Sequence, residues 1–177
     1  ASNYSLNSTV INIAKRVLNS SGSKTYDANT NALAGAITLS NLVSGEALNH
    51  SGTATIGSAN AGSYTITNLA GITIADGSGG SASNYTLTGG THNFTVNRRP
   101  LNATLARQYD GTTAAAGSTL SAFDALQGGE TLTLSGSGTA ANDNVANGIS
   151  VSSLGTLALV NGTGAASNYS LNSAVIN

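Results

Sequence analysis

Alternation of apolar and polar residues is the main pattern along this chain, and it predicts short β-strands throughout. In residues 1–13, Tyr4, Leu6 and Val10 fall on one face of an extended chain, and polar residues alternate with them. Further alternating runs are separated by Gly, Asn and Ser, which favour turns. We expect strands at 17–18, 36–42, 48–56, 63–69, 71–75, 119–126, 131–139, 148–154 and 156–160. Because no segment keeps a helical period, the predicted fold class is all-β, with at most a helical turn in 36–42 or 119–126.

Two short motifs recur and divide the chain into repeats. The sequence Ala-Ser-Asn-Tyr-Ser/Thr-Leu stands at 1–6, 82–87 and 166–171. A basic residue followed by x-Tyr-Asp-Ala/Gly stands at 24–28 and again at 107–111. Tandem repetition at this spacing indicates small modules arranged along the chain.

The motifs predict where the modules begin and end. We expect residues 1–12 to be the terminal strand of a preceding repeat, 13–97 to form a first module and 98–177 a second. The junction at 97–100 contains the only proline of the sequence, which favours an extended backbone before it. We expect the two modules to touch only near 97–101 and near its counterpart at 15–17.

About six short strands per repeat of about 83 residues predict two tandem β-sandwich-like modules. A β-grasp-like module with one short helix is the alternative. Within either fold, an Asp before Ala or Gly can accept backbone N–H bonds in a turn, and a preceding Tyr can bury its ring while its hydroxyl finds a partner. Ala28, which stands where the second repeat has Gly111, suggests a weaker need for a positive φ in the first repeat. The candidate structural residues are Tyr26, Asp27, Tyr109, Asp110, Asn84, Tyr85, Asn168 and Tyr169.

Composition narrows the classes of function. Charged residues make up 7% of the chain, against about a quarter in an average globular protein, and the net charge is -1. No basic face is available to bind phosphates, so nucleic acid is not an expected partner. The chain has no cysteine, which excludes disulfides and Cys-based metal sites. No apolar run approaches the ~20 residues that span a bilayer, so membrane insertion is not expected.

Candidate catalytic and metal-binding residues are sparse. Each repeat has one Asp and one Glu in equivalent places, Asp27 with Glu46 and Asp110 with Glu130. Paired carboxylates can cleave glycosides, but no His, Lys or Arg recurs beside both members to shift their pKa values. We therefore expect a protein that is not an enzyme and that carries no cofactor.

The histidines and one Asn-rich segment also suggest no metal site. His50 and His92 have no counterparts in the second repeat, and we expect both to be exposed to solvent. The segment at 142–144 offers oxygen ligands but lacks the complete pattern of a calcium loop.

Taken in register, the Tyr-Asp-Gly/Ala and Ser-Asn-Tyr motifs resemble the YDG/MBG repeat family of large bacterial surface adhesins, and the resemblance covers essentially the whole chain. Such repeats occur in filamentous-haemagglutinin-like proteins exported by two-partner secretion. The resemblance implies a secreted, cell-surface protein in which the repeats act as a stalk in adhesion, aggregation or biofilm formation. It implies neighbouring repeats of the same chain as partners, and a host or bacterial surface glycan or protein as a further candidate. The alternative function is a glycan- or protein-binding module, which would show a concave polar site with exposed aromatic side chains in both repeats.

Overall fold

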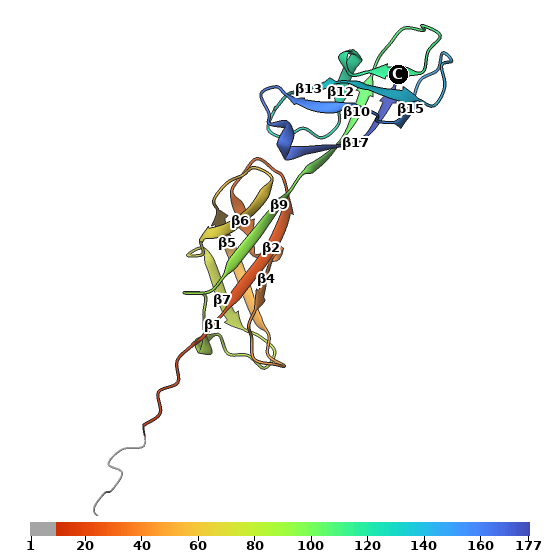
Figure 1. Cartoon of the computed structure of the whole chain (residues 1–177). Helices are drawn as coiled ribbons and strands as arrows, with labels where there is room; N and C mark the ends of the chain where they lie inside the picture. Colours follow the sequence, from red (N-terminus) through yellow and green to blue (C-terminus); the bar gives the residue numbers. More distant parts are fainter. Residues whose placement is uncertain (1–9) are drawn as a thin grey trace, which may run out of the picture.

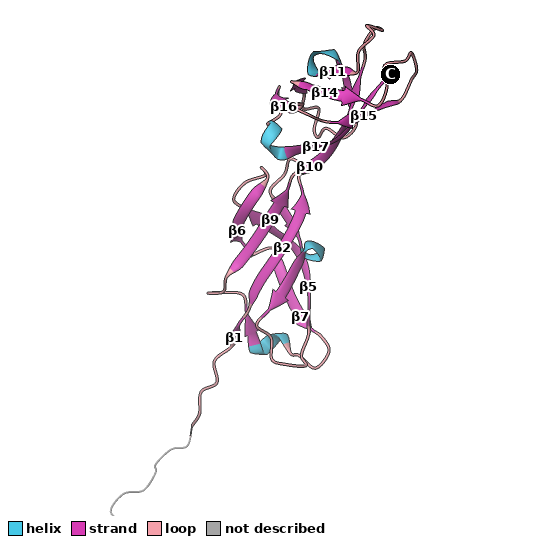
Figure 2. Ribbon diagram, turned by 45° about the vertical axis from the view of Figure 1, so that its right-hand side comes forward, coloured by secondary structure: helices cyan, strands magenta, loops and turns pink. Residues whose placement is uncertain are grey.

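The computed structural model describes residues 10–177, which form two β bodies joined end to end (Figure 1). Strands β1 to β9 make the first body and β10 to β17 the second. All helical segments among the described residues are 3-10 turns of three residues, which Figure 2 colours cyan. The predicted all-β class with two tandem β modules is confirmed.

The first body contains one main mixed sheet, in the order β3-β5-β6-β9-β2-β4. Its elements are β1 (Arg16–Val17), β2 (Asn19–Thr25), β3 (Asn31–Leu33), η1 (Ala34–Ala36), β4 (Ile37–Ser40), β5 (Leu48–Ile56), β6 (Gly62–Asn68), β7 (Ile72–Asp76), η2 (Ala82–Asn84), β8 (Tyr85–Thr86) and β9 (His92–Asn97). The neighbours β2 and β9 run parallel, and the other pairs of this sheet are antiparallel. A short parallel pairing of β1 with β8 precedes the β2–β9 ladder.

The second body repeats this topology, in the order β11-β14-β15-β17-β10-β12. Its elements are β10 (Arg99–Leu105), β11 (Ala114–Ala116), η3 (Gly117–Thr119), β12 (Leu120–Phe123), β13 (Leu132–Ser135), β14 (Ser137–Ala140), β15 (Ile149–Ser153), β16 (Ala158–Asn161), η4 (Ala166–Asn168) and β17 (Tyr169–Ile176). Here β10 and β17 form the central parallel pair, and β13 pairs with β16 in a separate two-stranded ladder. Strands β2 and β9 in the first body and β10 and β17 in the second therefore lie side by side inside the main sheet.

A glycine bends one strand of each body so that it serves two ladders. The first half of β5 pairs with β7 and the second half with β3 and β6. At the bend, Gly52 has φ +99°, and a Cβ there would lie 1.9 Å from the carbonyl oxygen of Gly71. Gly136, with φ +82°, takes the same place between β13 and β14. Only glycine fits this conformation at such close approach, and the bend curls each sheet over its own core.

Apolar side chains from alternating strand positions fill the interior of each body. Phe94 and Val96 of β9 are buried, and so are Leu105 of β10 and Ile176 of β17. The larger buried cluster crosses from one body to the other, because it joins Tyr26 and Phe94 with three residues of the second body, namely Leu101, Leu132 and Tyr169.

Several sequence predictions of strands need correction. The sequence Ser-Ser-Gly at 20–22 predicts a turn, but this segment lies inside β2, because Gly22 leaves room for the Phe94 ring on the neighbouring strand. The strand predicted at 1–13 lies largely outside the described residues, and 10–15 form no strand. The side chains of Val10, Ile11 and Ile13 in this segment are exposed.

The β-grasp-like alternative differs from the sandwich-like prediction in its helix. A β-grasp module also pairs its first and last strands in parallel, as β2 and β9 do here. In the described part of the chain, however, the helical segments are single 3-10 turns rather than a packed helix. Each body is a curled sheet that covers itself, without a helical layer.

Candidate functional site

The turn that carries Tyr-Asp is fixed by the basic residue before it. In the first module, Lys24 Nζ lies 2.8 Å from Asp27 Oδ1 and donates hydrogen bonds to the carbonyl oxygens of Asn29, at 2.7 Å, and Asn31, at 2.8 Å. Asp27 Oδ1 also accepts the Asn29 N–H at 3.2 Å. Ala28, between them, has φ +61°. The prediction that Ala28 relaxes the need for a positive φ is therefore wrong: the turn geometry fixes this φ whichever residue is present.

The second module builds the same turn with arginine. Arg107 donates to the carbonyl oxygens of Thr112 and Ala114 and lies 3.6 Å from Asp110 Oδ1. Asp110 Oδ1 accepts the N–H and the hydroxyl of Thr112, each at 2.9 Å. The Thr112 N–H bond holds the pKa of Asp110 below its usual value. Gly111 has φ +71°. Asp27 and Asp110 thus accept backbone N–H bonds in equivalent turns.

In the two Ser-Asn-Tyr motifs that the structure describes, the Tyr donates its hydroxyl to a glutamate of its own module. Tyr85 donates to Glu46 Oε2, and Tyr169 donates to Glu130 Oε2 at 2.5 Å. The pKa of Tyr85 is raised chiefly by the bond to the Glu46 carboxylate. The pKa of Tyr169 is raised by burial first and then by Glu130. The recurring glutamates are therefore hydrogen-bond acceptors for buried tyrosines, a role that the sequence analysis missed.

Tyr26 carries this arrangement across the boundary between the modules. Its ring is buried, and its hydroxyl donates to Glu130 Oε1 at 2.6 Å. Both oxygens of Glu130 therefore accept a tyrosine hydroxyl, one from each module. The Tyr26 ring also meets the Tyr169 ring edge-on, with centroids 5.3 Å apart and planes at 77°. Burial, followed by the bond to Glu130, raises the pKa of Tyr26 to about 12.

Asn168 and Arg99 complete this contact, which we call the inter-module joint (Tyr26, Asn60, Ala61, Arg99, Glu130, Asn168 and Tyr169). Asn168 Oδ1 accepts the Ala61 N–H at 2.8 Å, and Asn168 Nδ2 donates to Asn60 Oδ1 at 3.0 Å. Arg99 Nη1 donates to the Tyr26 carbonyl oxygen at 3.2 Å. Contact between the modules thus extends well beyond the predicted junction, and the prediction of contacts only near 15–17 and 97–101 is wrong. The side chains that extend it come from loops distant in sequence, which a local pattern does not bring together.

In the first module, the two carboxylates of the predicted pair are far apart. Glu46 accepts a hydrogen bond from Tyr85, and Tyr85 of β8 lies opposite Arg16 of β1, at the start of the module. Asp27 follows β2, at the opposite end of the same stretch of extended chain, which corresponds to about 30 Å at ~3.3 Å per residue. The two carboxylates cannot act on one substrate bond. Among residues 10–177, no group of three or more His, Asp or Glu side chains is placed to hold a metal ion.

The two histidines are structural, and the prediction that they are exposed is wrong. His92 is buried, with Nδ1 2.9 Å from Ser20 Oγ and Nε2 2.8 Å from the Leu87 carbonyl oxygen. His50 is half-buried, with Nε2 2.9 Å from the Ile37 carbonyl oxygen. The period of two that places His92 on the face of Phe94 and Val96 was the signal that could have identified it.

The remaining motif residues differ between the two modules. Asn84 and Tyr109 are exposed, whereas their counterparts Asn168 and Tyr26 are buried in the joint. In the segment 142–144, Asn142 Oδ1 accepts the Asn144 N–H at 3.0 Å, so this side chain closes a turn. Within residues 10–177, no helix has the length and apolar character needed to cross a membrane.

Comparison with known proteins agrees with the internal repeat. A family model described as the YDG domain matches residues 13–92 and again 97–176. No curated protein and no solved structure matched the chain. Since the two matches together cover most of the sequence, the chain belongs to the YDG domain family.

Proposed function

We propose that this chain is a non-enzymatic spacer, in which two YDG modules form a stiff segment of the stalk of a secreted bacterial surface adhesin. The observation that carries the proposal is the shared carboxylate of the joint. Glu130 accepts hydroxyls from Tyr26 of one module and Tyr169 of the other, and the two rings are buried against each other. The motif residues therefore support turns and the connection between modules, which is the role expected of a spacer.

The backbone at the joint supports stiffness as well. Strand β9 ends at Asn97 and β10 begins at Arg99, so Arg98 alone separates two strands that belong to different sheets. Figure 1 shows these strands as one green path from the first body to the second. Bending here would separate Tyr26 from Glu130 and expose a shared apolar cluster to water. The joint is thus expected to resist bending rather than to act as a hinge.

The adhesin context rests on the resemblance of the repeats and on composition. A chain without cysteine and with few charges fits a surface-exposed array stabilised by contacts between neighbouring repeats. A ligand-binding role would need an aromatic site present in both modules. Tyr109 is exposed, but its counterpart Tyr26 is buried in the joint, so the spacer role is the better supported one.

Stiffness of the joint is the property to measure. Thr38 and Ala122 are exposed and occupy equivalent positions on β4 and β12. Because the chain lacks cysteine, Thr38→Cys with Ala122→Cys accepts a pair of spin labels without further changes. Pulsed electron paramagnetic resonance should give one narrow distance distribution, and a broad distribution would contradict the spacer proposal.

Two further measurements address adhesion and location. The isolated chain should bind nothing on glycan and surface-protein arrays, and a specific ligand would favour the binding-module alternative. Antibodies against the chain should label intact cells of the source bacterium without permeabilisation. Labelling that required permeabilisation would contradict the surface location.

A further inference from the structure

We propose that the two outer ends of this chain are complementary docking surfaces, so that the Tyr109 end of one copy binds the Glu46 end of a second copy. The inference deepens the proposed spacer role and rests on it, since it takes the joint to be the functional element of the repeat. The partner is another YDG module, and the hydroxyl of Tyr109 in one copy would donate to Oε1 of Glu46 in the next.

The Glu46 end is built like the face of the second module that receives Tyr26. Tyr85 donates to Oε2 of Glu46, just as Tyr169 donates to Oε2 of Glu130. Tyr26 occupies the second oxygen of Glu130, whereas among residues 10–177 no hydroxyl bonds to Oε1 of Glu46. One acceptor position of Glu46 therefore remains for a tyrosine hydroxyl from outside the module.

The residues around Glu46 are arranged like those around Glu130 in the second module. Arg16 Nε donates to the Asn41 carbonyl oxygen at 2.5 Å, the counterpart of the 2.9 Å bond from Arg99 Nε to Ala125. Asn84 is exposed where its counterpart in the second module is 1% exposed. A pocket of about 510 Å³ opens here, and Arg16, Glu46, Asn84 and Tyr85 are among the residues that line it. This pocket is placed to receive a ring between Glu46 and Asn84.

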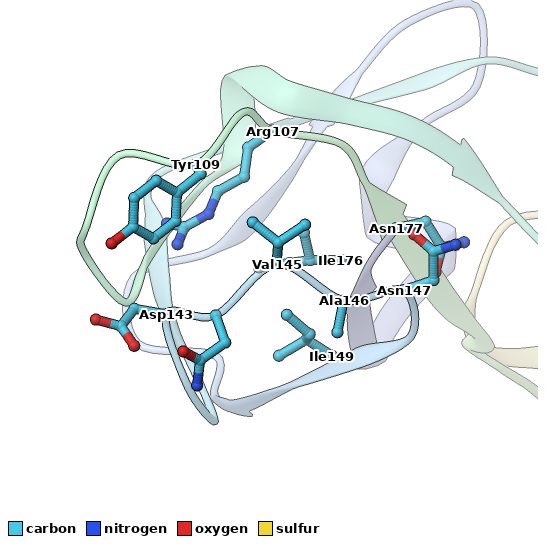
Figure 3. A pocket seen from close by; sticks show the side chains of 10 residues that line it. Arg107, Tyr109, Asp143, Val145, Ala146, Asn147, Ile149, Ile176 and Asn177 are labelled. Carbon is cyan, nitrogen blue, oxygen red and sulfur yellow. The ribbon is translucent and has the colours of Figure 1, made fainter.

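The opposite end of the chain presents the matching side chain. Tyr109 is the tyrosine of the second Tyr-Asp turn and is 66% exposed, against 3% for its counterpart Tyr26. Figure 3 shows Tyr109 beside Arg107 and Val145 at the edge of a small pocket. Val145 is also exposed, so the end of the second module carries an apolar patch next to the tyrosine. Burying these two side chains would favour docking.

A loop near Tyr109 matches the loop that contacts Asn168 in the joint. Ser58 Oγ accepts the Asn60 N–H at 3.1 Å, and Asn142 Oδ1 accepts the Asn144 N–H at 3.0 Å. The two loops therefore start with the same turn, although the second has eight residues (141–148) and the first five (57–61). By this equivalence, the loop of one copy lies beside Asn84 of the next.

A direct fusion of two copies tests the docking. Joining Asn177 to Ile13 of a second copy recreates the sequence Val-Ile-Asn-Ile-Ala-Lys, which already stands at 10–15. The linkage raises the effective concentration of the two ends for each other. With Ala122→Cys in the first copy and Thr38→Cys in the second, the label pair spans the new joint. We expect one narrow distance distribution, like that across the joint within one copy.

The same substitution in either copy supplies a matched control. Tyr109→Phe in the first copy removes the hydroxyl at the new joint, and we expect loss of the narrow distance peak. Tyr109→Phe in the second copy lies at the outer end and should leave the peak unchanged. Since the wild-type side chain is exposed, neither variant should impair folding.

The possible results separate this inference from the spacer role. A broad distribution across the new joint, with a narrow one across the joint within each copy, would overturn the docking proposal and leave the spacer role intact. Broad distributions across both joints would overturn both proposals. An equal effect of Tyr109→Phe in either copy would exclude Tyr109 as the docking side chain.

Discussion

At the scale of single residues, the Tyr-Asp turn places Ala28 in a conformation that suits glycine. Ala28 has φ +61° and Gly111, its counterpart, has φ +71°. For alanine this left-handed conformation costs about 1–2 kcal/mol, while glycine loses about 0.5–1 kcal/mol more conformational entropy on folding. Ala28→Gly should therefore raise the free energy of unfolding by about 0.5–1 kcal/mol, measured by urea denaturation. Gly111→Ala should lower it by a similar amount, and changes of the same sign in both variants would refute strain as the cause.

The buried pair of Ser20 and His92 makes a second prediction at this scale. Ser20 Oγ lies 2.9 Å from His92 Nδ1, and the equivalent paired residues of the second module are Ala103 and Ala174. Ser20→Ala leaves a buried ring nitrogen without a partner, so the free energy of unfolding should fall by about 1–3 kcal/mol. The exposed neighbour Ser21 on the same strand is the control, since Ser21→Ala should change the free energy of unfolding by less than about 0.5 kcal/mol. Equal effects of the two substitutions would show that the hydrogen bond contributes nothing.

At the scale of the strands, the bend in β5 depends on Gly52. A Cβ at this position would combine φ +99° with a 1.9 Å approach to the Gly71 carbonyl oxygen. Gly52→Ala should lower the free energy of unfolding by about 2–5 kcal/mol, the sum of backbone strain and overpacking. Gly35→Ala is the matched control, because its Cβ would have no neighbour within 4 Å. Thermal unfolding followed by circular dichroism compares the two, and a tolerated Gly52→Ala would mean that β5 can bend elsewhere.

Local alternation predicted those strands that have one buried and one exposed face. The run 48–56 coincides with β5, and the run 63–69 nearly coincides with β6 (Gly62–Asn68). Strand β2 was not predicted, because Ser20 and Gly22 resemble a turn in sequence. Their place inside the sheet follows from their partners on β9, since Ser20 lies opposite His92 and Gly22 opposite Phe94. That pairing joins the first and last strands of the module, so its register is a long-range property that no local pattern contains.

The candidate site was predictable to a similar extent. Recurrence singled out Tyr26, Tyr85 and Tyr169, whose side chains are all buried, but it also singled out Tyr109, which is exposed. Their common acceptor type, glutamate, was not recognised, because Glu130 lies 104 residues from Tyr26 and 39 from Tyr169. Repetition shows that a residue matters to the fold, but it does not show which distant residue it contacts.

At the scale of the whole molecule, we expect the stability of the joint to depend on the protonation of Tyr26. Burial and Glu130 raise the pKa of Tyr26 from 10.0 to about 12, so the folded joint binds this proton more tightly than the unfolded chain does. The resulting stabilisation is complete below pH 10 and is lost as the pH rises to about 12. A pKa shift of two units corresponds to about 2–3 kcal/mol of stabilisation of the folded joint. Ionisation of Tyr26 would also place a phenolate beside the Glu130 carboxylate, and the two negative charges would repel each other. We therefore expect the label distance between positions 38 and 122 to stay narrow at pH 9 and to broaden between about pH 10 and pH 12.

Substitution of the two equivalent tyrosines distinguishes the joint from general alkaline unfolding. Tyr26→Phe removes the titrating hydroxyl together with a hydrogen bond to a charged group, which should weaken the joint by about 1.5–3 kcal/mol at neutral pH. Between pH 10 and pH 12, the joint of Tyr26→Phe should lose less stability than the wild-type joint, because Tyr26 no longer titrates. Some loss should remain, because the pKa of Tyr169 is also raised and its hydroxyl still bonds to Glu130. Tyr109→Phe removes an exposed hydroxyl outside the joint and should leave the wild-type pH profile unchanged. If the wild type, Tyr26→Phe and Tyr109→Phe all lost the narrow distance distribution at the same pH, the alkaline transition would be unfolding of the modules. The bonds to the Glu130 carboxylate would then not be what fixes the orientation of the two modules.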